Sequence, residues 1–346
     1  MPKEAAFAAV NLAMDDKKTT GLLFYGGEPM LEKQLIYEIV DYTKKINKDS
    51  GHVFHYKMTT NGTLLDEEFL VFSRDINMTI GFSHDGPAQD TCRLTRNGDA
   101  TFNLLEEKIP LLLKYQPYAA GMCVMDPSTV HNASSAVKFL FDRGFRYISL
   151  NVNYAKTAKW TKKHLAILED EYKKLSKMYI NWTKAEEKFY LSPFDMKILS
   201  HLKGEKYNED RRVMSREQPS VAPDGKLYSG SRYIGKPEFE IGDVYGGFDT
   251  EKRDFIYKTG GIPLPPCSNC AIKTRCNYIY DSLAGTEPGI VPEISPVQCA
   301  NEQMLTPIAD KIAEQLYRER NALFIHKHYN MMYSVVSLIE DNSMKL

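Results

Sequence analysis

The sequence predicts an α/β protein in which a parallel sheet, open or closed into a barrel, is followed by a small cysteine-rich domain and C-terminal helices. Short apolar runs alternate with amphipathic stretches over roughly the first 155 residues. Glycine-rich turns and a cluster of cysteines come next, and the chain then returns to a helical pattern. Strand–helix alternation at this pitch is typical of a parallel sheet.

The first part of the chain begins with a helix-like stretch that no strand precedes, and it then contains five apolar runs that we interpret as strands. The predicted strands are residues 22–25, 53–58, 78–82, 120–125 and 147–152. Helical patterns separate them at residues 31–47, 66–75, 101–115 and 132–144. Because a β/α unit normally starts with its strand, we expect this chain to begin partway through a unit.

The second part of the chain changes its character twice. Residues 162–205 are charged and helical, and we expect them to cover the sheet or to link it to a second domain. From about residue 211 the Asp-Gly and Gly-Gly turns of "PDGKLYSGSRYIG" and "EFEIGDVYGG" predict hairpins, before residues 300–340 return to helix. The predicted domains are residues 1–205 (partial barrel), 206–310 (cysteine-rich domain) and 311–346 (helical segment).

Composition narrows the class of protein. A chain of 346 residues can hold two domains or a barrel with an appendage. Its formal net charge of −1 gives no electrostatic reason to expect nucleic acid or an anionic membrane as a partner. No apolar run approaches the ~18 residues of a membrane span, and the start has no secretory core. We therefore predict a cytoplasmic protein, in which six cysteines favour metal binding or catalysis over disulfides.

A polar, turn-prone motif stands at the end of each predicted strand. The five sets are Gly26-Gly27-Glu28-Pro29, Thr59-Thr60-Asn61-Gly62, Ser83-His84-Asp85-Gly86-Pro87, Asp126-Pro127-Ser128, and Asn151 with Asn153. Any one of them could be an ordinary βα turn, but ligands bind at the carboxyl ends of parallel strands, so the ordered set predicts a small-molecule site. The diglycine lets the backbone approach a ligand, and Glu28 can accept hydrogen bonds from an ammonium group. Neither the glycine spacing nor the lysine of a phosphate loop is present.

The order and pitch of "GGEP", "TNGT" and "S-x-DGP" resemble the radical S-adenosylmethionine (SAM) superfamily. The tail "PDGKLY…GDV…CxxCxxxxxC…C" resembles the SPASM subgroup, which includes anaerobic sulfatase-maturating enzymes and maturases of ribosomally made peptides. The resemblance extends over nearly the whole chain. It implies a partial (β/α) radical-SAM-type barrel that lacks its first strand, joined to a SPASM, or twitch-like, domain.

The resemblance also assigns roles to residues of the strand ends. In the family the Gly-Gly-Glu motif holds the amino group of SAM, which points to Gly26, Gly27 and Glu28. Ser83 resembles the serine that contacts the carboxylate or ribose of SAM, and the less specific positions are Asn61 and Arg96. The implied reaction is hydrogen abstraction from a peptide or protein substrate by a 5′-deoxyadenosyl radical, with ferredoxin or flavodoxin as the reductant.

The motif that defines the family, CxxxCxxC, is absent from this sequence. Cys92 and Cys123 are isolated and far from its expected position. We interpret the chain as truncated before the motif, with a natural homologue without the cluster as the competing explanation. As printed, the chain has no ligands for the catalytic cluster, so we expect that it cannot cleave SAM reductively by itself.

Four cysteines near the C-terminus are spaced to hold one metal centre: Cys267, Cys270, Cys276 and Cys299. Thiolate-rich sites suit zinc or iron–sulfur, and the spacing alone does not separate the two. The SPASM resemblance favours iron–sulfur. The family pattern serves two auxiliary [4Fe-4S] clusters, but Tyr280 and Gly230 stand here at ligand positions of one of them. We therefore predict one auxiliary [4Fe-4S] cluster, with zinc as the less favoured occupant.

Other polar residues are weaker candidates. His52 fits no metal pattern and is interpreted as an ordinary strand histidine, whereas His84 is a candidate for facing the substrate. Asp85 is expected to cap or tighten its turn, and Arg93 to be exposed or to reach the SAM carboxylate. Cys92 is expected to be a small buried residue, with a reactive thiol as the alternative. The alternative function is a catalytically silent peptide-binding homologue with a structural metal or iron–sulfur site. Which peptide is modified, and which bond forms, stays open.

Overall fold

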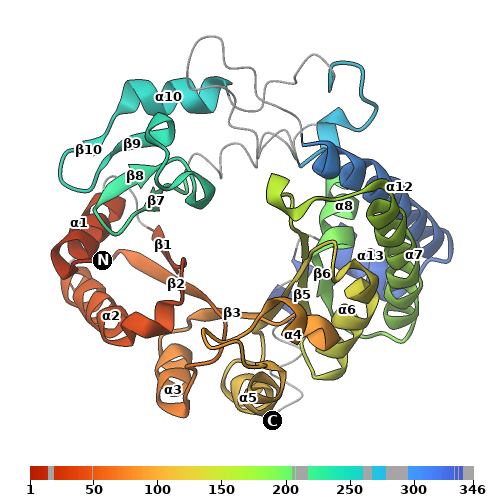
Figure 1. The fold of residues 1–346 in the computed structure, drawn as a ribbon, viewed down its shortest axis with the longest axis horizontal. Helices are drawn as coiled ribbons and strands as arrows, with labels where there is room; N and C mark the ends of the chain where they lie inside the picture. The colour runs from red at the N-terminus through yellow and green to blue at the C-terminus, as the bar shows by residue number, and fades with distance from the viewer. Residues whose placement is uncertain are drawn as a thin grey trace. The chain divides into compact units, whose positions relative to one another are not determined.

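The computed structural model describes residues 1–14, 19–48, 50–204, 207, 217–259, 267–277, 295–330, 332–333 and 335–337. The chain forms two compact units (Figure 1). The first comprises Met1–His84, Thr101–Ala120 and Glu205–Ile294, and the second comprises Asp85–Ala100, Gly121–Gly204 and Ser295–Leu346. The predicted domains are continuous stretches of sequence, whereas each of these units combines three separate segments. The predicted domain boundaries stay a prediction.

The predicted fold class is confirmed: the described strands include a six-stranded sheet in the order β1-β2-β3-β4-β5-β6, with no closed barrel detected among them. Three strands of this sheet belong to the first unit: β1 (Thr19–Phe24), β2 (Val53–Thr60) and β3 (Thr79–Ser83). β1 pairs with β2 in parallel, and β2 pairs with β3 in parallel. Each of these strands overlaps an apolar run that the sequence predicts. Because the strands are parallel, their carboxyl ends meet at one edge of the sheet.

In the first unit one helix precedes β1, and helices follow β1, β2 and β3, as the alternation predicts. They are α1 (Lys3–Met14), α2 (Lys33–Asn47), α3 (Glu67–Asp75) and α5 (Phe102–Tyr115), with the short 3-10 helix η1 (Pro29–Glu32) before α2. Ala6 and Val10 of α1 and Ile39 of α2 form a buried cluster, and Leu22 and Phe24 of β1 pack against it. Asp66 caps α3, because its carboxylate accepts a hydrogen bond from the Phe69 amide at 2.8 Å.

A second, antiparallel sheet completes the described part of the first unit and confirms the predicted hairpins. Its strands are β7 (Ser220–Val221), β8 (Lys226–Tyr228), β9 (Glu240–Asp243) and β10 (Gly247–Phe248), in the order β10-β9-β8-β7. Two 3-10 helices, η5 (Ser231–Tyr233) and η6 (Pro237–Phe239), lie between β8 and β9, and α10 (Thr250–Thr259) follows β10. The small core of this sheet includes Leu227, Ile241 and Ile256, and it is closed by Ala5 of α1.

The second unit contains the remaining strands of the large sheet and most of the long helices. Its strands are β4 (Ala120–Met125), β5 (Tyr147–Val152) and β6 (Tyr190–Leu191). Its helices are η2 (Gly86–Ala88), α4 (Gln89–Cys92), η3 (Val130–Asn132), α6 (Ala133–Asp142), η4 (Lys156–Ala158), α7 (Lys162–Lys184), α8 (Ser192–Lys203), α12 (Pro296–Arg318) and α13 (Ala322–Tyr329). α12 packs against both α7 and α8.

One prediction of secondary structure is wrong. Residues 162–205 do not form a single helical stretch, because α7 ends at Lys184 and the short strand β6 precedes α8. The break has a local cause. Glu186 adopts a left-handed backbone with φ of 59°, and Pro193 stands in the first turn of the new helix.

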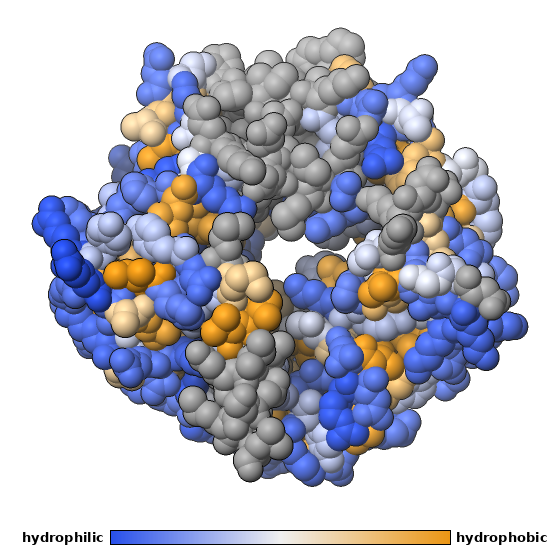
Figure 2. Space-filling model, turned by 180° about the vertical axis from the view of Figure 1, so that it is seen from behind, coloured by the Kyte–Doolittle hydropathy of each residue, from blue (hydrophilic) through white to orange (hydrophobic). Residues whose placement is uncertain are grey.

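Some large apolar side chains are exposed on the surface. On the face drawn in Figure 2, hydrophilic residues predominate and the hydrophobic ones lie in separate patches. In the part of the chain that the structure describes, no helix combines the length and the apolar character of a membrane span.

Candidate functional site

The diglycine after β1 forms an open turn. Gly26 and Gly27 have φ angles of 97° and 55°, which a side chain would disfavour. A Cβ atom built on either residue would meet no other atom within 4 Å. The glycines are therefore required by the backbone conformation and not by close packing, and the space beside them is open to a ligand.

Glu28 joins the end of β1 to the end of β2. Its Oε1 accepts hydrogen bonds from the Met30 amide at 3.0 Å and from Thr60 Oγ1 at 2.6 Å. Its Oε2 accepts one from the Asn61 amide at 2.7 Å. A carboxylate has about four lone-pair positions, so these contacts leave Oε2 able to accept one further hydrogen bond. The half-buried carboxylate is thus held in place by the protein and still has room for a cationic donor.

Asn61 and Ser83 lie at the same edge of the first unit as Glu28. Asn61 is exposed, and its Oδ1 accepts hydrogen bonds from the amide and hydroxyl of Thr63 at 2.9 and 2.8 Å. Thr60 pairs with Phe82, which puts the half-buried Ser83 level with Asn61 on the neighbouring strand. The structure therefore brings together five of the predicted cofactor-binding residues: Gly26, Gly27, Glu28, Asn61 and Ser83. Arg96 is an exposed residue of the second unit, and its predicted role stays a prediction.

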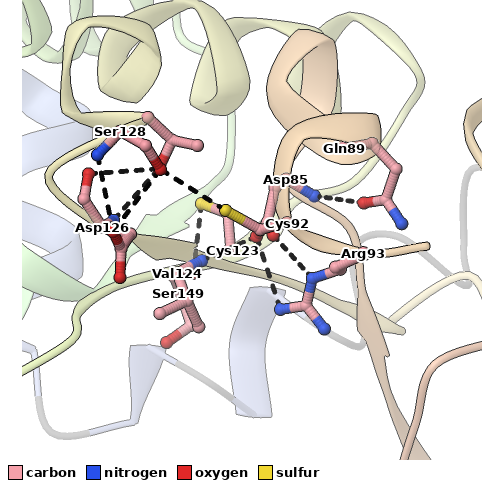
Figure 3. Close-up of polar contacts among 10 residues, drawn as sticks. Asp85, Gln89, Cys92, Arg93, Cys123, Val124, Asp126, Ser128 and Ser149 are labelled. Carbon is pink, nitrogen blue, oxygen red and sulfur yellow. Dashed lines mark hydrogen bonds and ion pairs between the residues drawn. The ribbon is translucent and has the colours of Figure 1, made fainter. Parts of the chain in front are cut away.

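Asp85 tightens the turn after β3, as the sequence predicts (Figure 3). This carboxylate is only 2% exposed. It accepts hydrogen bonds from Arg93 Nε at 2.6 Å and from the amide of Val124 in β4 at 2.8 Å. Its own backbone amide donates to Gln89 Oε1 at 2.9 Å. Arg93, expected to be exposed or to bind the SAM carboxylate, is instead partly buried in an ion pair with Asp85.

A second polar group stands at the ends of β4 and β5. Asp126 Oδ2 accepts a hydrogen bond from Asn153 Nδ2 at 3.0 Å, which ties the end of β4 to the residue that follows β5. Cys92 is exposed, and its Sγ lies 3.7 Å from Ser128 Oγ, so the expectation that Cys92 is buried is wrong. Cys92 is the last residue of the short helix α4 (Gln89–Cys92). Cys123 in β4 is buried, and burial together with the nearby Asp85 raises the pKa of its thiol.

Two histidines, His52 and His84, are buried in the first unit. His84 is fully buried between the rings of Phe82 and Phe102, so it does not face a substrate. His52 is also buried, and its Nε2 lies 2.8 Å from Thr20 Oγ1 on the neighbouring strand, as expected of an ordinary strand histidine.

The cysteine segment forms two successive turns. The amide of Cys270 donates to the carbonyl of Cys267 at 3.1 Å, and the amide of Lys273 donates to the carbonyl of Cys270 at 3.2 Å, before the 3-10 helix η8 (Lys273–Arg275). Cys267, Cys270 and Cys276 are half-buried. A tight turn that joins two half-buried thiols suits thiolate ligation of zinc or of iron–sulfur, and Lys273 and Arg275 add positive charge beside it.

The fourth cysteine, Cys299, is half-buried in the first turn of α12. Cys299 belongs to the second unit and the other three cysteines to the first. Among the described residues, no three Cys, His, Asp or Glu side chains are gathered for a metal ion, so the four-cysteine site stays a prediction. Tyr280, one of the two positions at which the sequence departs from the family pattern, lies outside the described residues.

Comparison with known proteins finds related sequences, although no family model matches the chain. A cysteine-type anaerobic sulfatase-maturating enzyme of Clostridium novyi (strain NT) is 31% identical over 128 residues, which are 36% of this chain and 34% of that enzyme. Its counterpart from Clostridium perfringens (strain ATCC 13124) is 27% identical over 133 residues, again 36% of this chain and 34% of the enzyme. In both comparisons the matched region spans about a third of the relative's length.

A longer match reaches a serine-type anaerobic sulfatase-maturating enzyme of Bacteroides thetaiotaomicron, 24% identical over 299 residues, 77% of this chain and 71% of that enzyme. Among solved structures, native anSMEcpe with bound AdoMet, which is SAM, has a TM-score of 0.74 and 17% identity, and the match covers 92% of this chain and 91% of that one. The complex of anSMEcpe with AdoMet and the Kp18Cys peptide has a TM-score of 0.73, with the same identity and coverage. These findings agree with the resemblance predicted from the motifs: the chain is similar in sequence and in fold to anaerobic sulfatase-maturating enzymes.

Proposed function

We propose that this chain works in a radical SAM maturase of the SPASM type, which binds SAM at the corner formed by residues 26–28 with Asn61 and Ser83. The observation that carries the proposal is the carboxylate of Glu28, which is fixed by Met30, Thr60 and Asn61 and keeps one lone-pair position. An ammonium group is the donor best suited to that position, because a charged donor and a charged acceptor give a strong hydrogen bond. SAM carries such an ammonium group.

Each neighbouring residue has a separate part in the proposed site. The open turn of Gly26 and Gly27 lets the backbone approach the cofactor. The hydroxyl of Ser83 and the side chain of Asn61 supply hydrogen bonds to the carboxylate or ribose. SAM, together with a reduced iron–sulfur cluster, supplies the radical that removes hydrogen from the substrate. The chain's own residues hold the cofactor and exclude water from it.

The proposed substrate is a peptide or protein segment, and ribosomally made peptides are the favoured class. One of the similar structures was solved with a bound peptide, which supports this class. The proposed reductant is ferredoxin or flavodoxin. A cytoplasmic location belongs to the same proposal, because thiolates that hold iron–sulfur stay reduced there.

The four cysteines Cys267, Cys270, Cys276 and Cys299 are proposed to hold one auxiliary [4Fe-4S] cluster. The turn between Cys267 and Cys270 supports this assignment. No CxxxCxxC stands in these 346 residues, so this chain by itself is proposed not to cleave SAM reductively. Formation of 5′-deoxyadenosine by the printed chain alone would contradict that part of the proposal.

Binding of SAM to the purified chain, measured by equilibrium dialysis, tests the cofactor site. Glu28→Gln should weaken binding about tenfold or more, because it removes a charge-assisted hydrogen bond worth roughly 1.5–3 kcal/mol. Glu32→Gln is the matched control, since Glu32 is an exposed carboxylate of the same segment, and it should bind SAM like the unchanged chain. A chain that is folded by circular dichroism but does not bind SAM would favour the peptide-binding homologue instead.

A further inference from the structure

Thr60, the last residue of β2, places a hydroxyl on the buried face of its strand. The side chain is 1% exposed and follows the buried Tyr56 and Met58 at two-residue intervals, as the alternation of a strand requires. A buried hydroxyl costs free energy unless it is hydrogen-bonded, whereas valine would fill the same space without needing a partner. A polar residue at this place is therefore explained by the contacts that its hydroxyl makes.

The Thr60 hydroxyl connects Glu28 to the turn after β2. Its Oγ1 donates a hydrogen bond to Glu28 Oε1 at 2.6 Å and accepts one from the Gly62 amide at 2.9 Å. A backbone amide can only donate and a hydroxyl has a single hydrogen, so the direction of both bonds is fixed. The Met30 and Asn61 amides also donate to the Glu28 carboxylate, so all three of its partners here act as donors.

The three donors are divided unequally between the two oxygens of Glu28. Oε1 accepts hydrogen bonds from Met30 and Thr60, which fill its two lone-pair positions, and Oε2 accepts one from Asn61. Without the Thr60 hydroxyl, Oε1 would also have an open position, and a contact that fixes the rotation of the carboxylate would be lost. Thr60 therefore decides which oxygen meets a ligand and in which orientation that oxygen is held.

We propose that Thr60 is a positioning residue for the cofactor corner: its hydroxyl fills Oε1 of Glu28, so that a cationic donor is directed to Oε2. This inference deepens the proposed function and rests on it, because the donor is the ammonium group of SAM. Thr60 acts through Glu28, since it is buried and gives its only hydroxyl hydrogen to that carboxylate. Loss of the hydroxyl should thus weaken SAM binding only while Glu28 is present.

Binding of SAM to purified variants, measured by equilibrium dialysis, tests this role. Thr60→Val keeps the shape and removes the hydroxyl, and the dissociation constant for SAM should rise about three- to tenfold, the usual effect of one hydrogen bond. Thr60→Ser keeps the hydroxyl and should bind SAM like the unchanged chain. A residue that served packing alone would give the reverse order, in which valine is tolerated and serine is not. Thr60→Ala, compared with Thr60→Ser, repeats the test if the valine variant does not fold.

A double-mutant cycle shows whether Thr60 acts through Glu28. Glu28→Ala removes the carboxylate that Thr60 contacts. In a chain that already carries this change, Thr60→Val should alter the dissociation constant for SAM by less than about twofold. An equal loss of affinity with and without the Glu28 carboxylate would overturn the positioning role.

Thr43→Val is the matched control. Thr43 is a fully buried threonine of α2, and its hydroxyl donates to the Val40 carbonyl at 2.7 Å and lies 2.6 Å from the Tyr56 hydroxyl. This change also removes a buried hydroxyl, but it should leave SAM binding as it is in the unchanged chain. Equal SAM binding by the Thr60→Val and unchanged chains would overturn the inference and leave the proposed cofactor site intact. A folded, unchanged chain that does not bind SAM would overturn the proposed function itself, and this outcome is visible before any variant is compared.

Discussion

Gly62 is a position at the edge of the sheet where the structure allows one residue type. It follows Asn61 in the turn after β2 and has a φ of 80°. A Cβ atom on Gly62 would lie 2.2 Å from Cε2 of Phe82, which is fully buried in β3. Both the backbone conformation and the space therefore require glycine here, and the ring of Phe82 supports the turn that presents Asn61.

A matched pair of glycine substitutions separates these two requirements. Gly98→Ala changes a glycine with a φ of 88° and open space around it, and it should cost about 1–2 kcal/mol of unfolding free energy from backbone strain alone. Gly62→Ala adds the clash with Phe82 and should cost about 1–3 kcal/mol more. Urea denaturation of both variants measures the difference. Equal losses would show that the Phe82 ring moves away without cost.

The motifs at the strand ends were predictable at the residue scale, but the partners of their side chains were not. Glycine, asparagine and aspartate identify a turn by their local preferences, which is why the corner residues could be named from the sequence. Arg93 was assigned to solvent or to a ligand because nothing local shows that it meets Asp85, eight residues earlier in the chain. Cys92 was expected to be buried from its residue type, whereas its place on a short helix decides its exposure.

At the scale of elements, a buried charge cluster holds the helix α13 to the start of α8. Asp195 is 2% exposed and accepts hydrogen bonds from the Leu191 amide at 2.6 Å and the Tyr179 hydroxyl at 2.7 Å. Lys327 Nζ and His328 Nε2 of α13 lie 2.6 and 3.3 Å from Asp195 Oδ1. Burial alone would raise the pKa of Asp195, but Lys327 and His328 outweigh it and hold this pKa well below its usual range.

This cluster predicts a loss of stability in acid. Because the pKa of Asp195 is lower in the folded chain than in the unfolded chain, its contribution is complete above the unfolded value of about 3.9 and falls as the pH drops below it. Asp195→Asn should remove that part of the pH dependence and lower the stability near neutral pH. Unfolding free energies from urea titrations at about pH 6 and pH 3 measure both effects.

Asp170→Asn is the control for this experiment, since Asp170 is an exposed carboxylate of α7. It should keep the acid dependence of the unchanged chain. If Asp195→Asn and the unchanged chain lose the same free energy between the two pH values, the charge cluster does not contribute to acid sensitivity.

The same cluster explains why the strand β6 could not be predicted. Its two residues, Tyr190 and Leu191, give no alternating pattern, and the surrounding Lys- and Glu-rich sequence indicates helix. The strand exists because Tyr190 and Leu191 pair with Tyr147 and Ile148 of β5, and because the Leu191 amide is bonded to Asp195. These are tertiary contacts, which override local propensity. The longer strands β4 and β5 were predictable to the residue, since their apolar runs are bounded by clear turns.

At the scale of the whole molecule, the order of elements and the similarity to sulfatase-maturating enzymes could be predicted, whereas the packing units could not. Alternating apolar runs determine the class of fold, and motifs placed after successive strands identify the resemblance. The segments of the second unit, Asp85–Ala100, Gly121–Gly204 and Ser295–Leu346, are separated in sequence. No change in composition indicates such a grouping, because it depends on which helices share a core.

Iron analysis of the whole chain tests the four-cysteine site. After anaerobic reconstitution the unchanged chain should hold about four iron atoms, as one [4Fe-4S] cluster requires. Cys270→Ser and Cys299→Ser should each lose most of this iron, because each removes one thiolate ligand. Cys92→Ser should retain it, since Cys92 is outside the cysteine pattern. Stoichiometric zinc without iron, or iron that survives the Cys299 change, would contradict the assignment.

The hydrogen bond from the Asn61 amide to Glu28 makes this amide sensitive to a ligand that binds Glu28. The chemical shift of an amide proton depends on the charge distribution of its acceptor. A cationic ligand that bonds to the second lone pair of the same oxygen would draw electron density from that oxygen and weaken its hydrogen bond to the amide. A single backbone resonance in an isotope-labelled sample would thus register occupancy, without any turnover.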